Sequence, residues 1–229
     1  DTTRPTVTIN QDAAQADPTG VSPINFAVVF SEPVSGFTGA DIALSGTAGA
    51  TTAVVTGGGT TYNVAVSGMA GSGTVIAAVN LGAATDPANN TSFASTSTDN
   101  TVTYDIAVPT VTINQAVGQA DPTNISPINF TVVFSKPVTG FTSADVVLNG
   151  TAAGGSSAVV TGSGTTYNVA VSGMTVSGTV IATVPAGAAQ DSAGNGNTNS
   201  TSTNNIVTYD VTAPTVTINQ AAAQADPTN

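Results

Sequence analysis

Three copies of one heptapeptide, Pro-Thr-Val-Thr-Ile-Asn-Gln, constrain the fold of this chain more than any other feature of its sequence. The copies begin at Pro5, Pro109 and Pro214, so they lie 104 and then 105 residues apart. Solenoid units repeat every 20 to 50 residues or so, whereas this period is close to the commonest size of a whole domain. The sequence therefore predicts a tandem array of domains, with complete repeats at residues 1–105 and 106–210 and the partial start of a third at 211–229.

Each repeat consists of short segments in which apolar and polar residues alternate, separated by turns rich in Gly, Pro and Asp. Alternation with a period of two is typical of a strand with one buried face, and the Thr and Val that dominate these segments favour strands. The three consecutive glycines Gly57–Gly59 are expected to form a tight connection between two strands. We therefore expect seven strands in the first repeat, at residues 6–10, 24–30, 41–44, 53–56, 61–66, 74–79 and 101–105.

Seven short strands in a unit of about 105 residues, with turns between them and no helical pattern, are typical of an antiparallel sandwich. The predicted fold is all-β: tandem immunoglobulin-like antiparallel β-sandwiches of about seven strands each. The Cys and Trp residues that mark antibody domains are absent. The arrangement is therefore inferred from the number of strands and from the resemblance described below.

Composition argues against several classes of function. With 13 acidic residues against Arg4 and Lys136, the net charge is −11, and nucleic acid is not an expected partner because its binding relies on basic side chains. The chain has no His and no Cys, so it cannot build a Ser-His or Cys-His nucleophile and is not expected to be an enzyme. No apolar run approaches the length of a membrane span, so direct membrane insertion is not expected. Small secreted animal domains usually carry disulfides, so the lack of Cys fits a secreted bacterial module better. Another source of stiffness is then expected, and a metal is the obvious one.

The acidic residues are distributed with the repeat. Ten of the thirteen occupy equivalent positions in the copies, whereas Glu32 is replaced by Lys136 in the second repeat. Common ancestry of the copies could by itself preserve these residues as solvated turn and capping aspartates. The ten are Asp1, Asp105 and Asp210; Asp17, Asp121 and Asp226; Asp41 and Asp145; and Asp86 and Asp191.

The strand order predicts that some of these acids meet. If consecutive strands are antiparallel, Asp17 and Asp105 lie at one pole of the first repeat, and Asp145 and Asp191 lie at the facing pole of the second. End-to-end stacking would gather four mutually repelling carboxylates. A calcium ion, which takes six to eight oxygen ligands, would resolve the conflict. We therefore predict calcium at the junctions between repeats, with ligands drawn from Asp17, Asp105, Asp145 and Asp191 and from the equivalent Asp1, Asp41, Asp86, Asp121 and Asp210.

Several segments together resemble a known family. They are the heptapeptide, Ser31–Gly46, Tyr62–Met69, the Gly-Thr-Val-Ile-Ala run and the Asp191–Asn195 loop. The chain resembles the bacterial Ig-like repeats of very large surface adhesins of the biofilm-associated and repeats-in-toxin types. This resemblance implies an extracellular stalk on the bacterial cell surface, whose neighbouring repeats are its main partners, and it implies calcium at the linkers. The implied ligands are Asp105, Asp145 and Asp191.

Two other functions remain open. The polar loops could form a module that binds a glycan or a protein, in which case Phe93, an aromatic residue in a long loop, is the expected contact. Alternatively, the chain could be a subunit of a self-assembling filament, in which the segment 214–220 docks as a strand into another copy. The leading hypothesis is the structural extender stiffened by calcium.

Overall fold

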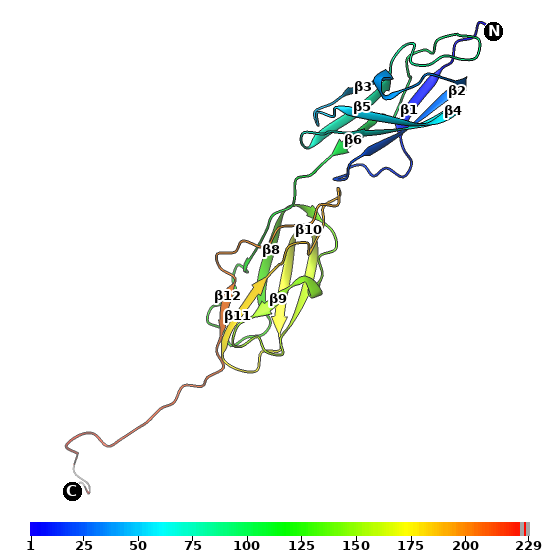
Figure 1. Ribbon diagram of the computed structural model, residues 1–229. Coiled ribbons are helices and arrows are strands. Elements are labelled where there is room, and N and C mark those ends of the chain that lie inside the picture. Colours follow the sequence, from blue (N-terminus) through cyan, green and yellow to red (C-terminus); the bar gives the residue numbers. More distant parts are fainter. Residues whose placement is uncertain (225–226, 228–229) are drawn as a thin grey trace.

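The computed structural model describes residues 1–224 and 227. Two β-sandwiches follow one another along the chain with their long axes nearly in line, and the segment after the second sandwich extends away from it (Figure 1). The N-terminus lies at the outer end of the first sandwich, so the two sandwiches meet at a single junction in the middle of the molecule.

The first repeat forms two three-stranded antiparallel sheets, β1-β2-β4 and β3-β5-β6, and a single 3-10 turn, η1, precedes β3. Buried residues alternate with more exposed ones along the paired parts of the strands, so one face of each sheet packs against the other sheet. The elements are β1 (Val7–Gln11), β2 (Ile24–Val34), η1 (Gly39–Asp41), β3 (Ile42–Ser45), β4 (Thr52–Ser67), β5 (Gly73–Val79) and β6 (Thr101–Tyr104).

The second repeat has the same topology, with sheets β7-β8-β10 and β9-β11-β12. This arrangement confirms the prediction of an all-β fold built from Ig-like antiparallel sandwiches. Its elements are β7 (Val111–Gln115), β8 (Ile128–Val138), η2 (Ser143–Asp145), β9 (Val147–Asn149), β10 (Ser157–Ser172), β11 (Gly178–Thr183) and β12 (Ile206–Tyr209).

The predicted number of strands needs a correction, because the described part of each repeat contains six strands rather than seven. The two strands expected on either side of Gly57–Gly59 form a single strand, β4. Gly57 and Gly59 have positive φ angles of 113° and 69°, and the pairing of β4 with β2 shifts register between Val29 and Val34. A shift of this kind bends a strand without ending it, so the glycines are a bend within β4 and not a turn.

Each sandwich has its own core, and three aromatic rings form one end of it. In the first repeat, Phe30, Phe37 and Tyr62 pack edge to face with centroids 5.2–5.8 Å apart, the geometry that the charge distribution of aromatic rings favours. The buried Tyr62 hydroxyl donates a hydrogen bond to the carbonyl of Val34 at 3.0 Å. The second repeat builds the same cluster from Phe134, Phe141 and Tyr167. The two cores share no residue among those described.

Candidate functional site at the junction between the repeats

Asp105 follows β6 directly and begins the linker between the two sandwiches. One of its carboxylate oxygens, Oδ1, accepts hydrogen bonds from the backbone N–H of Ala107 at 2.9 Å and from the Ser72 hydroxyl at 3.3 Å. The same local turn recurs at the equivalent Asp1 and Asp210, each of which accepts from the backbone N–H two residues later. The turn fixes the carboxylate through Oδ1 and leaves Oδ2 to face the next repeat.

The side chain of Lys136, in β8 of the second repeat, contacts that free oxygen. Its ammonium donates to Asp105 Oδ2 at 2.7 Å, to Asp191 Oδ2 at 2.9 Å and to the carbonyl of Ala107. An ammonium has three hydrogens to donate, and here each of them has an acceptor. One side chain therefore links the linker to two segments of the second repeat.

Asp191 is held in a tight loop that also contacts the first repeat. Its Oδ1 accepts from the backbone N–H groups of Ala193 and Asn195 at 3.0 and 2.9 Å. The Asn195 amide donates to the carbonyl of Asp105 at 2.8 Å, and Ala193 accepts from the N–H of Gly20 at 2.9 Å. A Cβ on Gly20 would lie 2.8 Å from Asn195 Oδ1 and 3.0 Å from the carbonyl oxygen of Asp105, so a side chain there would crowd this contact between the repeats.

These contacts shift the pKa of all three charged groups. The hydrogen bond from Lys136, followed by that from Ala107, lowers the pKa of Asp105. Burial alone would raise the pKa of Asp191, but the bonds from Lys136 and Asn195 outweigh it and the pKa is lowered. The hydrogen bond to Asp105 is the main reason that the pKa of Lys136 is raised. All three groups are therefore charged at neutral pH, as one cation between two anions.

The structure brings together only part of the predicted acidic cluster. Of the four carboxylates expected at this junction, Asp105 and Asp191 meet, with Lys136 between them. Asp17 accepts from the backbone N–H of Thr103 at 2.9 Å, within its own repeat. Asp145 accepts from the backbone N–H and the hydroxyl of Thr142, the residue that caps η2.

The equivalent residues in the other copies follow the same pattern. Asp41 caps η1 through Thr38, and Asp121 accepts from the backbone N–H of Thr208. Hydrogen bonds from Thr212, followed by one from Ser177, lower the pKa of Asp210. The remaining member of the series, Asp226, lies outside the described residues. Asp41, Asp121 and Asp210 therefore serve local turns and caps, which the sequence also allowed.

A second acidic cluster lies at the outer end of the first repeat. Asp1, Glu32 and Asp86 each place a carboxylate oxygen within 4.8 Å of the others. They are the equivalents of Asp105, Lys136 and Asp191, so the two sites differ in one charge-reversing substitution. Our sequence reasoning included Asp1 and Asp86 but missed Glu32, because it ranked acids by their recurrence in both repeats.

Asp86 is the buried member of this cluster, with 3% of its surface exposed. Its Oδ2 accepts from the side-chain amide of Asn90 and its Oδ1 from the backbone N–H of the same residue, both at 2.8 Å. Hydrogen bonding to Asn90 is the main reason that its pKa is lowered. The carboxylate is thus held ionised and in a fixed orientation beside Asp1 and Glu32.

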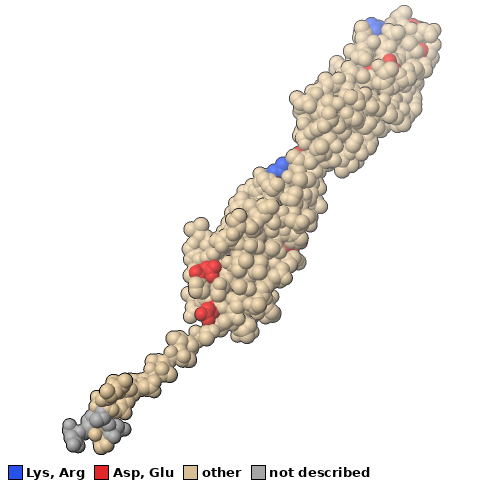
Figure 2. All heavy atoms as spheres, turned by 60° about the vertical axis from the view of Figure 1, so that its left-hand side comes forward, with Lys and Arg blue, Asp and Glu red and all other residues tan. Residues whose placement is uncertain are grey.

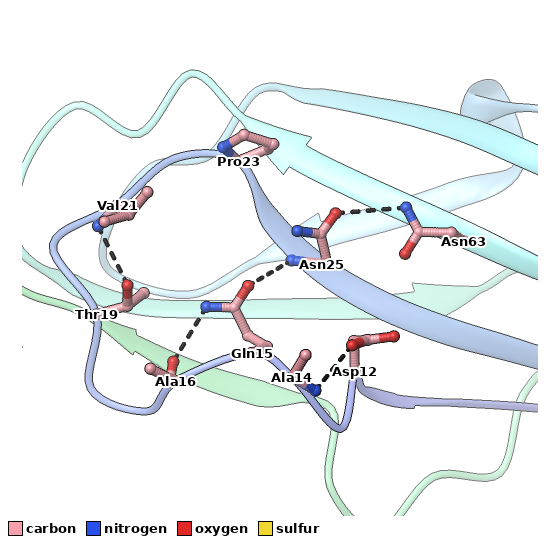
Figure 3. Close-up of a pocket in the computed structure, with 9 residues that line it drawn as sticks. All are labelled: Asp12, Ala14, Gln15, Ala16, Thr19, Val21, Pro23, Asn25 and Asn63. Atoms are coloured by element: carbon pink, nitrogen blue, oxygen red, sulfur yellow. Dashed lines mark hydrogen bonds between the residues drawn. The ribbon is translucent and has the colours of Figure 1, made fainter.

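The structure also provides a test of the polar loops as a ligand-binding surface. A hollow of about 410 Å³ follows β1, and Figure 3 shows the residues that line it. Gln15 accepts from the backbone N–H of Asn25 and donates to the carbonyl of Ala16, and Asn63 donates to the Asn25 side chain (Figure 3). These polar groups are bonded to one another and hold the loop to the sandwich, and no aromatic ring lines the hollow.

Phe93, the expected contact for a glycan, has a partner within the protein. The Arg4 guanidinium lies 4.4 Å from the centroid of its ring. The same guanidinium donates to the carbonyls of Thr91 and Ser92 at 2.7 and 3.0 Å. A cation covering the ring in this way takes up one of its faces, so Phe93 helps to hold the long loop against the N-terminal segment.

Two end-to-end Ig-like sandwiches, joined through a compact polar junction, define a tandem structural module. The comparison with known families agrees: residues 1–106 match the model of the bacterial Ig-like domain, so the first repeat is similar to the domains of this family. A search of curated proteins finds no match. Domains of this family are typically non-enzymatic structural modules and are often extracellular. The match therefore suggests a module that extends a surface protein. In the part of the chain that the structure describes, no helix is long and apolar enough to cross a membrane.

Proposed function

We propose that this chain is an extender segment of a bacterial surface adhesin or extracellular fibre, in which each repeat adds its length to a stalk. The observation that carries the proposal is the end-to-end stacking of the two sandwiches through contacts that all lie close to the linker (Figure 1). An arrangement of this kind grows in one direction with every repeat added. The neighbouring repeats are then the principal partners of each module.

The junction has the features that stiffness requires. Two segments of the second repeat make these contacts. Lys136 in β8 contacts Asp105, and the Asp191–Asn195 loop contacts Asp105 through Asn195 and Gly20 through the backbone of Ala193. Bending that separates the repeats at this place would break these contacts. In Figure 2 the two repeats form two lobes that meet at a narrow waist, and the surface near this waist carries few charges.

The absence of cysteine allows a direct test by double electron–electron resonance between two spin labels. Gly58→Cys and Ser163→Cys place one label in each repeat, at equivalent exposed positions of β4 and β10. A stiff extender gives one narrow distance distribution. The matched control carries both labels in the second repeat, at Ser163 and at Val117, which is fully exposed.

The control pair measures the width that the labels themselves contribute. An inter-repeat distribution nearly as narrow as the control supports the extender. A distribution that is several times broader, or one that contains short distances from folded-back molecules, contradicts it.

We also propose that the cluster of Asp1, Glu32 and Asp86 binds calcium. Three carboxylates are hard oxygen ligands of the type that calcium prefers, and their oxygens lie within 4.8 Å of one another. The equivalent position in the second repeat holds a cation, the Lys136 ammonium. Calcium would supply the positive charge there, and Asp1 would tie the chain that enters the repeat to Asp86.

Calorimetric titration with calcium tests this site. The chain is expected to bind one calcium ion, and Glu32→Gln is expected to abolish the binding because it removes one of the three charges. Asp12→Asn is the matched control, since Asp12 is an acid of the first repeat that lies outside the cluster. Equal binding by the chain and its Glu32→Gln variant would overturn the proposal.

A further inference from the structure

The equivalent residues at the two ends of the first repeat form sites of opposite character. At the outer end Asp1, Glu32 and Asp86 are three anions. At the junction the same positions hold Asp105, Lys136 and Asp191, which are two anions on one cation. The surrounding turns are the same, because Asn90 and Asn195 both donate to the carbonyl of the preceding linker aspartate.

The junction does not fit a calcium ion as the structure stands. The Lys136 ammonium contacts both carboxylate oxygens, at 2.7 and 2.9 Å, and also the carbonyl of Ala107. These are the oxygens that a metal would need as ligands, and a metal ion at the same place would lie against a positive charge. The residues at this junction, as they are arranged here, therefore do not fit the calcium ion that we predicted for Asp105 and Asp191 from the sequence.

We propose that Lys136 is a built-in substitute for the metal, so that this junction stays rigid without any divalent cation. The inference rests on the proposed extender function and adds to it a second kind of junction. An array of such repeats would contain lysine junctions, which are independent of calcium, and glutamate junctions, which depend on it. The residue at this one position would then determine how each linker responds to calcium.

The repulsion between the two carboxylates matters more for this junction than the strength of the ion pairs themselves. Exposed ion pairs contribute little to stability, and the Lys136 side chain is 28% exposed. Without the ammonium, however, Asp105 and Asp191 are neighbouring anions that repel each other across the junction. The neutral contacts of Asn195 and Gly20 would then have to hold the repeats together against that repulsion.

Three variants in the spin-labelled chain separate the possibilities, each measured in a chelator and in calcium. The chain itself is expected to give the same narrow inter-repeat distribution in both conditions. Lys136→Met is expected to broaden it in both, because methionine neither neutralises the carboxylates nor binds calcium. Lys136→Glu, which reproduces the first repeat, is expected to broaden it in chelator and to restore the narrow distribution in calcium. Glu32→Lys, the matched control at the outer end, is expected to leave the junction unchanged.

Calorimetry provides a second measurement of the same proposal. In a Glu32→Gln background the chain is expected to take up no calcium, and adding Lys136→Glu is expected to create binding of one ion. Lys136 is not a member of either core cluster, so the variants are expected to stay folded, and circular dichroism checks this.

The outcomes distinguish this inference from the extender function. A distribution for the unmodified chain that is narrow in calcium and broad in chelator overturns the role of Lys136 and leaves the extender intact. A distribution that is broad in both conditions overturns both. A Lys136→Glu variant that does not respond to calcium also overturns the inference.

Discussion

Replacing Phe130 with alanine is expected to unfold the second repeat at a much lower urea concentration than the first. Phe130 is fully buried in β8, and a Phe→Ala change in a core costs about 3–5 kcal/mol through lost burial and the cavity that remains. A domain of this size has a total stability of about 5–15 kcal/mol. The variant repeat would therefore be left with little stability, whereas the first repeat should keep its own because the two described cores share no residue.

The expected unfolding curve has two transitions, and only the one that belongs to the second repeat is shifted. Hydrogen exchange measured by mass spectrometry assigns each transition to its repeat. Val133→Ala is the matched control in the same strand, because Val133 is 44% exposed and a surface substitution usually changes stability by less than about 0.5 kcal/mol. Phe26→Ala is expected to produce the mirror-image result in the first repeat. If both transitions shift together in the Phe130 variant, the repeats are not independent folding units.

The fold was predictable because its signals are local and occur twice. Segments such as 6–10 and 61–66 alternate with a period of two, and this alternation is typical of a sheet with one buried face. The second copy repeats each segment at a nearly constant offset, which separates real elements from chance patterns. The bend at Gly57–Gly59 was misread as a turn because glycines serve both purposes, and only the pairing with β2 distinguishes them.

The candidate site was harder to predict because it depends on which carboxylate oxygens already accept hydrogen bonds within their own repeat. Asp17 and Asp145 recur between the repeats as faithfully as Asp105 and Asp191, but hydrogen bonds to Thr103 and Thr142 occupy them locally. Sequence alone does not reveal that difference, since turn and capping aspartates and ligand aspartates are the same residue type. The sandwich topology correctly placed acids at the ends of the repeats but could not say which of them point across the junction.

The most informative signal in the sequence was a difference between the copies. Asp1 and Asp86 recur as Asp105 and Asp191, while Glu32 between them becomes Lys136. A reversal of charge beside two unchanged carboxylates gives three anions at one site and a cation between two anions at the other. At the second site the structure gives distances of 2.7 and 2.9 Å from one ammonium to both acids. A search for shared residues passes over such a site, whereas a search for compensated charges finds it.

Replacing Gly150 with alanine is expected to destabilise the second repeat by about 3 kcal/mol, which combines a strained backbone with a steric clash. Gly150 follows β9 with a φ angle of +106°, and a Cβ there would lie 2.2 Å from the carbonyl oxygen of Thr179. That carbonyl accepts from the N–H of Ala152, and the Thr179 backbone N–H donates to the hydroxyl of Thr151. A methyl group would therefore push the turn away from β11 and break hydrogen bonds that fasten it.

Two other glycines of the same repeat separate strain from clash. Gly140 also has a positive φ, +86°, but a Cβ there meets nothing within 4 Å, so Gly140→Ala should cost only the strain of about 1–2 kcal/mol. Gly154 has neither a positive φ nor a close neighbour, and Gly154→Ala should be neutral or stabilise by up to about 1 kcal/mol because it restricts the unfolded chain. Urea unfolding of the three variants is expected to rank them in this order. If Gly150→Ala lowers the free energy of unfolding by no more than Gly140→Ala does, a methyl group at residue 150 does not clash with Thr179 in the way that we predict.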